Sequence, residues 1–252
     1  MQGDIVWYEL LSPDVDASIE FYTSVIGWKA DKFGPDYTMF VSSQGPVGGV
    51  GKLPSIAPVP YWQSNIEVDN LDASVAKLQS LGGKVIHKEA VETVGSFAVV
   101  MDPQGAVFAL YQPATPTKLH DHQKHGEFRW NELYTSDNAA AIQFYEQMFG
   151  WKKLGAFDMG PHGTYISWGD RRGRMGGMMN RREGQPIAWG YYILADNVEA
   201  TADKALARGA KFMVPVMKTP TGEPFCMLMD PQGAVFALIG PDRVDAGSAD
   251  AK

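Results

Sequence analysis

A stretch of ten residues, MDPQGAVFAL, occurs twice in this chain without a single difference, at 101–110 and again at 229–238. Asp-Pro-Gln-Gly is typical of a tight turn, because Pro presets φ at the second turn position and Gly suits the last. Ala-Val-Phe-Ala-Leu then favours a short buried strand. Chance does not produce two such runs in one chain. The sequence therefore predicts a duplication in which each half closes on a turn and a strand.

The beginnings of the two halves also match. WYELLSPDVDASIEFYTSVIGWK at 7–29 aligns with WNELYTSDNAAAIQFYEQMFGWK at 130–152, and Trp, Glu, Phe-Tyr and Gly-Trp stand in the same places. A weaker similarity exists inside the first half, where Asp-Ala-Ser follows a β-like run in both 12–22 and 68–78. The segment 194–206 takes the corresponding place in the second half. We therefore expect four similar modules, two in each half.

Each module shows the same order of expected elements. An alternating run such as Val6–Leu10 predicts a strand with two different faces. A helix should follow, capped by an acidic or amide side chain. The candidate caps are Asp14, Asn70, Asp137 and Asn197. Three strands come next, which in the second module we place at 84–95, 96–101 and 106–112. The order β-α-β-β-β is thus predicted four times.

The repeats set the expected domain boundaries. The first domain should cover 1–113 and the second 128–241. The segment 114–127 is polar and contains Pro, as interdomain linkers often do. The tail at 242–252 is small and polar, and we expect it to be disordered.

Composition narrows the class of protein. A net charge of −7 argues against nucleic acid or an anionic membrane as the main partner. No run approaches the ~20 apolar residues of a membrane span. Asp4 and Glu9 interrupt the apolar residues at the start, so we expect no signal peptide. The single cysteine, Cys226, permits no internal disulfide and is expected to be a strand residue. We therefore expect a cytoplasmic protein.

Phe-Tyr and Gly-Trp at the end of the first helix, DPQGAVFAL at the close of each half, and four βαβββ modules together resemble the vicinal oxygen chelate superfamily. This group includes glyoxalase I, the extradiol dioxygenases, fosfomycin-resistance enzymes and bleomycin-resistance binding proteins. The chain is most similar to its tandem two-domain glyoxalase-like branch, over nearly all of both halves. The resemblance implies an α+β fold in which each pair of modules makes a curved mixed sheet around a cavity. It does not fix the chemistry, because the group spans isomerases, oxygenases, transferases and binders.

The resemblance also implies where metal ligands would stand. In the metal enzymes, a His or Gln comes from the opening strand of each module and a Glu comes from the closing strand. In the first half of this chain those three positions hold Trp7, Gln63 and Ala109. In the second half they hold Trp130, Gly190 and Ala237. Indole and methyl groups offer a divalent cation no usable lone pair. We therefore expect no metal at this site and no other cofactor.

The same strand faces carry the candidate ligand-binding residues. The parity that places Trp7 on the cavity side also places Glu9 there. The candidates are Trp7, Glu9, Gln63, Trp130, Glu132, Tyr134 and Tyr192, and Asn65 shares the face of Gln63. Indoles can stack on a planar ligand while Glu or Gln fixes its polar groups. The catalytic residues are unknown, but a Glu beside a Trp suits a general base, which makes Glu9 and Glu132 candidates. Alternatively, the indoles fill the cavity and the glutamates make internal hydrogen bonds.

Three further motifs have plainer interpretations. HDHQKH at 120–125 has metal-ligand spacing, but a polar linker lacks rigid support, so we expect a solvated segment. RRGRMGGMMNRR at 171–182 favours a solvated hairpin turn, with attraction for an anionic ligand as the alternative. Gly48-Gly49 and Gly176-Gly177 lack the context of a phosphate loop. They should leave room on the cavity side or permit a bulge.

These observations favour a protein that binds a small organic molecule in an aromatic-lined cavity, or converts it without the usual metal. Whether it is an enzyme stays open. One alternative is a metal-dependent lyase or extradiol-dioxygenase-like enzyme with other ligands, and another is a non-catalytic structural or protein-interaction module. We expect a small-molecule ligand, and neither nucleic acid nor membrane as a partner. The chain should be a monomer with an intrachain pseudo-dimer, or a homodimer.

Overall fold

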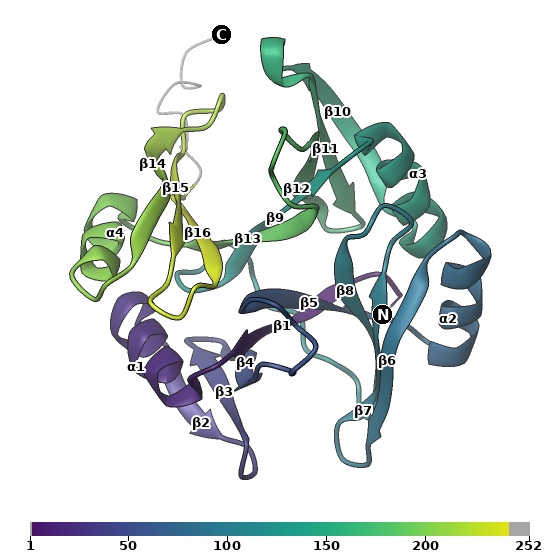
Figure 1. Cartoon of the computed structure of the whole chain (residues 1–252), viewed down its shortest axis with the longest axis horizontal. Coiled ribbons are helices and arrows are strands. Elements are labelled where there is room, and N and C mark those ends of the chain that lie inside the picture. The colour runs from purple at the N-terminus through teal and green to yellow at the C-terminus, as the bar shows by residue number, and fades with distance from the viewer. Residues whose placement is uncertain (1, 242–252) are drawn as a thin grey trace, which may run out of the picture.

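The computed structural model describes residues 2–241 and contains two mixed sheets of eight strands each (Figure 1). The strands of the first sheet are β1 (Ile5–Ser12), β2 (Lys29–Lys32), β3 (Tyr37–Ser42), β4 (Gly45–Lys52), β5 (Tyr61–Glu67), β6 (Lys84–Val91), β7 (Gly95–Met101) and β8 (Val107–Pro113). Those of the second are β9 (Phe128–Thr135), β10 (Lys152–Asp158), β11 (Thr164–Asp170), β12 (Gly173–Asn180), β13 (Ala188–Leu194), β14 (Lys211–Lys218), β15 (Pro224–Met229) and β16 (Val235–Ile239). The expected tail at 242–252 lies outside the described residues.

Four helices complete the four modules. They are α1 (Val15–Ile26), α2 (Leu71–Ser80), α3 (Asn138–Phe149) and α4 (Val198–Leu206), and a short 3₁₀ turn spans Gly160–His162. The predicted β-α-β-β-β order is therefore confirmed in every module. Among the described residues no helix is both long and apolar enough to cross a membrane.

The two sheets have the same topology, β2-β3-β4-β1-β5-β8-β7-β6 and β10-β11-β12-β9-β13-β16-β15-β14. Within a module the opening strand pairs with the last strand in parallel, as in β1 with β4. The two modules of a half meet through their antiparallel opening strands, β1 with β5 and β9 with β13. This arrangement confirms the vicinal oxygen chelate fold class. One predicted boundary was wrong: β6 ends at Val91 rather than at 95, because a turn closed by the Val94 amide on the Val91 carbonyl reverses the chain there.

The helix ends follow from local sequence. All four predicted caps are confirmed: the side chains of Asp14, Asn70, Asp137 and Asn197 each accept a hydrogen bond from a backbone amide in the first turn. Each such cap stabilises a helix by about 1 kcal/mol. α1 ends at Gly27 and α3 at Gly150, whose φ angles of 85° and 75° are left-handed and suit glycine.

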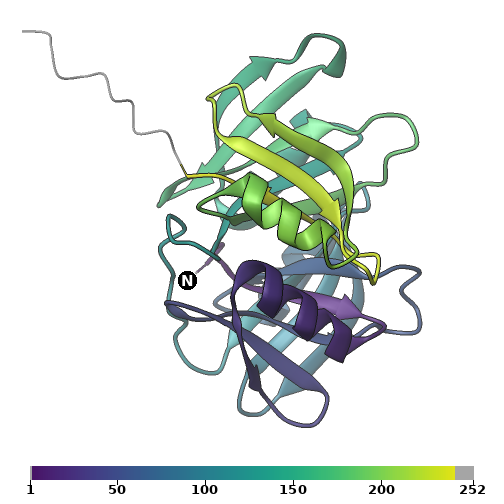
Figure 2. The same cartoon turned by 90° about the vertical axis from the view of Figure 1, so that its left-hand side faces the viewer.

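The two halves share one hydrophobic core. In Figures 1 and 2 the sheets turn their convex faces toward each other, and their open concave faces point outward. α1 packs beside α4 and α2 beside α3 at the boundary. The buried core is continuous across it, and the Tyr8 and Phe128 rings stack with centroids 3.8 Å apart. Polar groups also cross the boundary, as where the Tyr8 hydroxyl donates to Asn131 Oδ1 at 2.9 Å.

The repeated turn has a second role at this boundary. The Asp102 carboxylate accepts from the backbone amides of its own turn and also from the Tyr145 hydroxyl of α3, at 3.1 Å. In the other direction, the Tyr22 hydroxyl of α1 donates to Asp230 at 2.9 Å. Each half thus holds the closing turn of the other through the Tyr of its repeated Phe-Tyr pair. We call these two contacts the Tyr–Asp locks.

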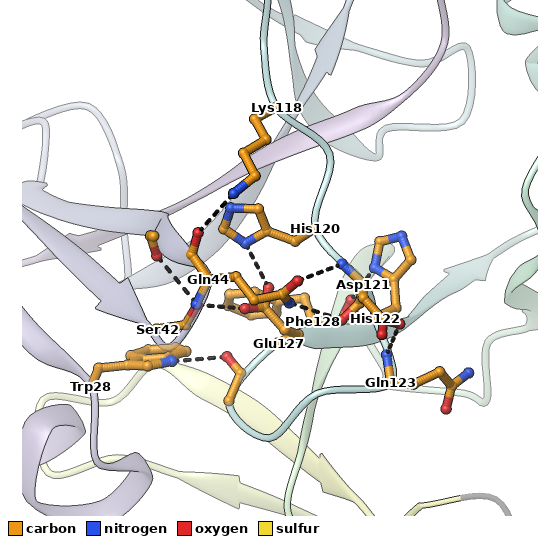
Figure 3. A network of polar contacts seen from close by, with 12 residues as sticks. Trp28, Ser42, Gln44, Lys118, His120, Asp121, His122, Gln123, Glu127 and Phe128 are labelled. Carbon is orange, nitrogen blue, oxygen red and sulfur yellow. Dashed lines mark hydrogen bonds and ion pairs between the residues drawn. The ribbon is translucent and has the colours of Figure 1, made fainter.

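The interdomain segment is largely exposed, as expected, but hydrogen bonds anchor it at several points. Figure 3 shows His120 and His122 beside the neighbouring groups that they contact. His120 Nδ1 lies 2.9 Å from the buried Glu127 carboxylate, which also accepts from Ser42. His122 Nδ1 donates to the Phe128 carbonyl at 3.0 Å, and His125 contacts the Ile26 carbonyl. The polar side chains of this segment therefore combine exposure to water with hydrogen bonds to both halves.

The arginine-rich segment forms the predicted hairpin between β11 and β12, but it is only partly solvated. The Arg171 guanidinium contacts the buried Asp4 carboxylate at 2.5 Å, and Arg172 pairs with Asp170 at 2.6 Å. These contacts tie the hairpin of the second half to the start of the first.

Candidate functional site

The concave face of the first sheet brings together the residues predicted there. β1 and β5 pair so that Trp7 lies opposite Asn65 and Glu9 opposite Gln63. Residues paired across a strand ladder point to the same side of the sheet. The alternate residues Tyr8 and Trp62 belong to the core between the halves, which places the predicted set on the opposite, concave side.

On this face Trp7, Tyr37 and Glu9 form a connected group. The Trp7 Nε1 donates to the Tyr37 hydroxyl at 2.9 Å. Burial raises the pKa of Glu9 to about 7, and a hydrogen bond from Tyr37 offsets part of that rise. A carboxyl group with this pKa exchanges its proton near neutrality, which is where a general acid or base is most useful.

The second half repeats this group. The Trp130 Nε1 donates to the Tyr165 hydroxyl at 3.0 Å, and that hydroxyl donates to Glu132 Oε2 at 3.0 Å. Burial raises the pKa of Glu132. Hydrogen bonds to this carboxyl group from four neighbours act against that rise, namely Tyr134, Tyr165, Trp130 and Tyr192.

Tyr37 and Tyr165 were missed by the sequence reasoning, and the glycine pairs explain their position. A Cβ built on Gly49 would lie 2.4 Å from the Tyr37 hydroxyl, and one built on Gly177 would lie 1.8 Å from that of Tyr165. The second glycine of each pair therefore leaves room for a tyrosine. This agrees with the expectation that the glycine pairs leave room on the cavity side. The signal was available, because the same number of residues separates each tyrosine from its glycine.

The two faces differ on the opening strand of their second module. On β5, Gln63 Oε1 and Asn65 Nδ2 are buried and have no hydrogen-bond partner. On β13 the matching positions hold Gly190, opposite Glu132, and Tyr192, opposite Trp130. A buried polar atom without a partner costs about 1–3 kcal/mol. The first face therefore has two buried polar atoms without hydrogen-bond partners on β5, whereas the described residues of β13 have none.

The positions implied for metal ligands do not suit a divalent cation. Ala109 and Ala237 are buried on the closing strands, next to Asn65 and Tyr192. The donors near these positions in the first half include the amide oxygens of Gln63 and Asn65 and the Glu9 carboxyl group, with no His and no second carboxylate. Within residues 2–241, no group of three or more His, Cys, Asp or Glu side chains is placed to hold an ion. The donor set thus does not fit the family's metal.

A crevice of about 230 Å³ opens elsewhere, between the turn after β7 and α3. Its walls include Asp102, Gln104 and Gln147. The Asp102 carboxylate is fully engaged by its turn and Tyr145, and Gln104 binds the start of α3 at Asp137. The crevice is therefore a feature of the boundary between the halves, and its Asp102 and Gln104 side chains already have partners.

Comparison with protein families covers both halves. Residues 127–238 match the family described as Glyoxalase/Bleomycin resistance protein/Dioxygenase superfamily, and residues 7–111 match the Glyoxalase-like domain. The chain is 31% identical to "Putative glyoxylase CFP32" of Mycobacterium bovis, over 95% of each chain. It is 29% identical to "Anthracycline biosynthesis protein DauV" of Streptomyces sp. (strain C5), over 94% of this chain and 93% of the relative.

Solved structures agree on the fold. The Mn(II)-bound glyoxalase from Novosphingobium aromaticivorans superposes with a TM-score of 0.66 at 15% identity, over 96% of this chain and 83% of that one. An extradiol ring-cleaving dioxygenase from B. fuscum gives 0.71 at 16% identity, over 100% and 76%. At such identities the likeness concerns architecture alone.

Proposed function

The chain belongs to the Glyoxalase/Bleomycin resistance protein/Dioxygenase superfamily, and we propose that it binds a small organic molecule against the concave face of its first sheet, without the metal used by many relatives. The residues assigned to this role are Trp7, Glu9, Gln63 and Asn65 from the sequence, with Tyr37 added by the geometry.

One observation carries this proposal. Gln63 Oε1 and Asn65 Nδ2 are buried without partners beside a carboxyl group whose pKa is raised to about 7. Most buried polar groups in proteins are hydrogen-bonded, so such a cluster is expensive to keep. A bound molecule that supplies the missing partners would recover that free energy. Sites of this kind combine apolar walls with a few convergent polar groups, as Trp7 and Tyr37 provide here.

The names of the relatives support a small-molecule role at a coarse level. One is named as a glyoxylase and another as an anthracycline biosynthesis protein. Both names belong to the chemistry of small organic molecules, yet they point to unrelated substrates. We therefore propose the class of ligand and not its identity.

A second candidate function is conversion of that ligand, with Glu9 as a proton acceptor. The deprotonated Glu9 carboxylate would take a proton from the bound molecule, and Tyr37 would stabilise the carboxylate through its hydroxyl. The pKa of Glu9 near 7 favours this role, because a base is most effective when its pKa is close to the working pH. A turnover assay of Glu9→Gln tests it: a variant that still binds but no longer converts the ligand supports the base, and unchanged turnover contradicts it.

The binding proposal is tested by a metabolite thermal-shift screen, run with and without a chelator. We expect ligands that raise the melting temperature equally in both conditions. Trp7→Ala should then weaken binding, because it removes the indole and frees Tyr37. Stoichiometric Zn, Ni, Mn or Fe in the purified protein, with binding lost on chelation, would instead favour a metal-dependent lyase or dioxygenase. A screen without any hit would favour a non-catalytic structural or interaction module.

A further inference from the structure

We infer that the two concave faces have diverged in role: the first takes one ligand that both donates and accepts hydrogen bonds, and the second is closed by contacts among its own side chains. This inference rests on the proposed function and makes it more specific. It assigns the ligand to one half of the chain and defines the chemistry that the ligand must present.

The first face determines that chemistry. Gln63 Oε1 can only accept a hydrogen bond and Asn65 Nδ2 can only donate one. They stand two residues apart on β5, so their Cβ atoms are separated by roughly 6.5 Å along one side of the strand. One compact molecule can reach both if it carries an N–H or O–H close to a carbonyl oxygen. Lactams, amides and α-hydroxy ketones have this pattern, whereas hydrocarbons and simple ethers do not.

The unpartnered atoms are covered in the ligand-free arrangement. Gln63 is 2% exposed and Asn65 is 7% exposed, so a ligand must displace a neighbouring side chain to reach them. Trp7 lies directly opposite Asn65 on β1 and is only half-buried. Its indole is held on this face by one hydrogen bond, to Tyr37. Side-chain rearrangements of this size are common on binding. Trp7 should therefore move and change its fluorescence when the ligand enters.

On the second face, no described residue next to Glu132 has a buried polar atom without a hydrogen-bond partner. Glu132 accepts from Tyr165 at 3.0 Å and is further engaged by Tyr134, Trp130 and Tyr192. Gly190 brings no side chain to the position of Gln63. Tyr192 stands in the place of Asn65 and packs in a small buried cluster with Ala237, Ile239, Trp130, Phe225 and Met227.

Among the residues that the structure describes, one buried unpartnered group remains on the second face, and it does not change the conclusion. The Ser167 hydroxyl on β11 is buried without a partner and lies close to Gly155. It stands three strands away from β13 in the sheet. A lone hydroxyl that can rotate is both donor and acceptor, so it cannot select a ligand by a fixed pair of groups.

The probes for this inference are 2-pyridone and 2-quinolone, which place an N–H beside a carbonyl in a planar ring. Their N-methyl derivatives have nearly the same shape and lack the donor. Titration calorimetry and tryptophan fluorescence would be measured for both pairs. We expect one binding site per chain, and at least a tenfold weaker Kd for each N-methyl derivative. The inference would be overturned by an equal Kd for a parent probe and its N-methyl derivative, by no binding of either parent probe, or by two equivalent binding sites per chain.

Matched variants assign the site to a half. Gln63→Leu and Asn65→Leu should each raise the Kd at least tenfold, since each removes one of the two hydrogen-bonding groups. Tyr192→Phe and Glu132→Gln in the second half should leave the Kd within twofold. Near-ultraviolet circular dichroism checks that all four variants are folded. If the second-half variants weaken binding as much as the first-half variants, the assignment is wrong.

The outcomes also separate this inference from the proposed function. If the metabolite screen finds ligands that bind through Glu132 and Tyr192, the protein still binds small molecules and only the division of roles fails. If neither the screen nor the probes give binding, the proposed function itself fails.

Discussion

At the scale of single residues, Glu9 is the group whose titration should be visible in the stability of the protein. Burial raises its folded-state pKa to about 7 from an unfolded value of 4.5. The folded chain therefore binds this proton more tightly than the unfolded chain. The contribution of this difference to the free energy of unfolding is fully present below pH 4.5 and is lost as the pH rises through 7. Above pH 7 the buried Glu9 carboxylate therefore lowers the free energy of unfolding.

Glu9→Gln should remove this pH dependence. The variant cannot ionise, so relative to the wild type it should gain on the order of 1–3 kcal/mol in free energy of unfolding between pH 5 and pH 8. Urea unfolding at the two pH values measures the difference. The exposed Glu92→Gln serves as the control and should show no such gain. An equal effect of Glu9→Gln at both pH values would show that Glu9 is ionised freely in the folded protein.

The glycines beside the two tyrosines give a second prediction at this scale. Gly49→Ala and Gly177→Ala should each destabilise the protein by about 1–3 kcal/mol, because the new methyl group would overlap the tyrosine ring. Tyr37→Ala should offset part of the Gly49→Ala loss in the double variant. Gly190→Ala is the control, since its Cβ would meet the nearest atom at an ordinary 3.5 Å. Additive losses in the double variant would contradict the assigned overlap.

At the scale of elements, the Tyr–Asp locks join each helix to the closing turn of the other half. Tyr22→Phe and Tyr145→Phe each delete one hydroxyl and leave one carboxylate oxygen of Asp230 or Asp102 without a partner. We expect a loss of about 1–3 kcal/mol in each case, and similar losses in the two, because the contacts are reciprocal. Chemical denaturation measures both. Tyr61→Phe should change stability by less than about 0.5 kcal/mol, because the Tyr61 hydroxyl makes no hydrogen bond with the described residues.

The elements also show what the sequence could and could not predict. Repeats and capping residues such as Asp14 and Asn70 predicted the four modules, because these signals act over a few neighbouring residues. Strand parity placed Trp7 and Glu9 on one face for the same reason. Tyr37 was missed because β3 reaches β1 only through β4. The equal spacing of each tyrosine from its glycine is present in the sequence, but its meaning depends on that strand pairing.

The hydrogen bonds of the interdomain segment were missed for a related reason. HDHQKH is polar, and its polarity correctly indicated exposure to water for most of its residues. Its histidines are also hydrogen-bonded, because Glu127 and the Phe128 carbonyl lie close by in the chain and Ile26 ends the helix of the first half. A contact between distant segments, such as that of His125 with Ile26, is not revealed by a single sequence.

At the scale of the whole molecule, the repeated MDPQGAVFAL acts in architecture. The Asp of each copy accepts a hydrogen bond from a tyrosine of the opposite half. The second Ala of each copy, Ala109 or Ala237, is buried on the concave side, and the Phe, Phe108 or Phe236, is part of the shared core. One ten-residue sequence therefore serves the closing strand and the boundary at once. A change in either copy would therefore affect contacts in both halves.

The same boundary predicts that the chain unfolds as one unit. A single core spans both sheets, and the Tyr–Asp locks cross between them. The Trp151 indole donates to the Gly3 carbonyl of the first half, and the Trp28 indole donates to the Gly126 carbonyl of the interdomain segment, both at 2.8 Å. Splitting the chain would expose this core and leave those groups unpaired. We therefore expect calorimetry of the full chain to give one transition, with equal calorimetric and van't Hoff enthalpies.

Separate expression of the halves tests this cooperativity directly. Residues 1–113 and 128–252 should be insoluble or poorly folded alone, because each would expose the convex face that the other covers. Mixed during refolding, they should recover the near-ultraviolet signal of the stacked tryptophans Trp151 and Trp168, whose rings lie 3.9 Å apart. The intact chain refolded in parallel is the control. A half that folds alone with a sharp transition, or two separate transitions in the full chain, would show that the shared core contributes little to the stability of either half.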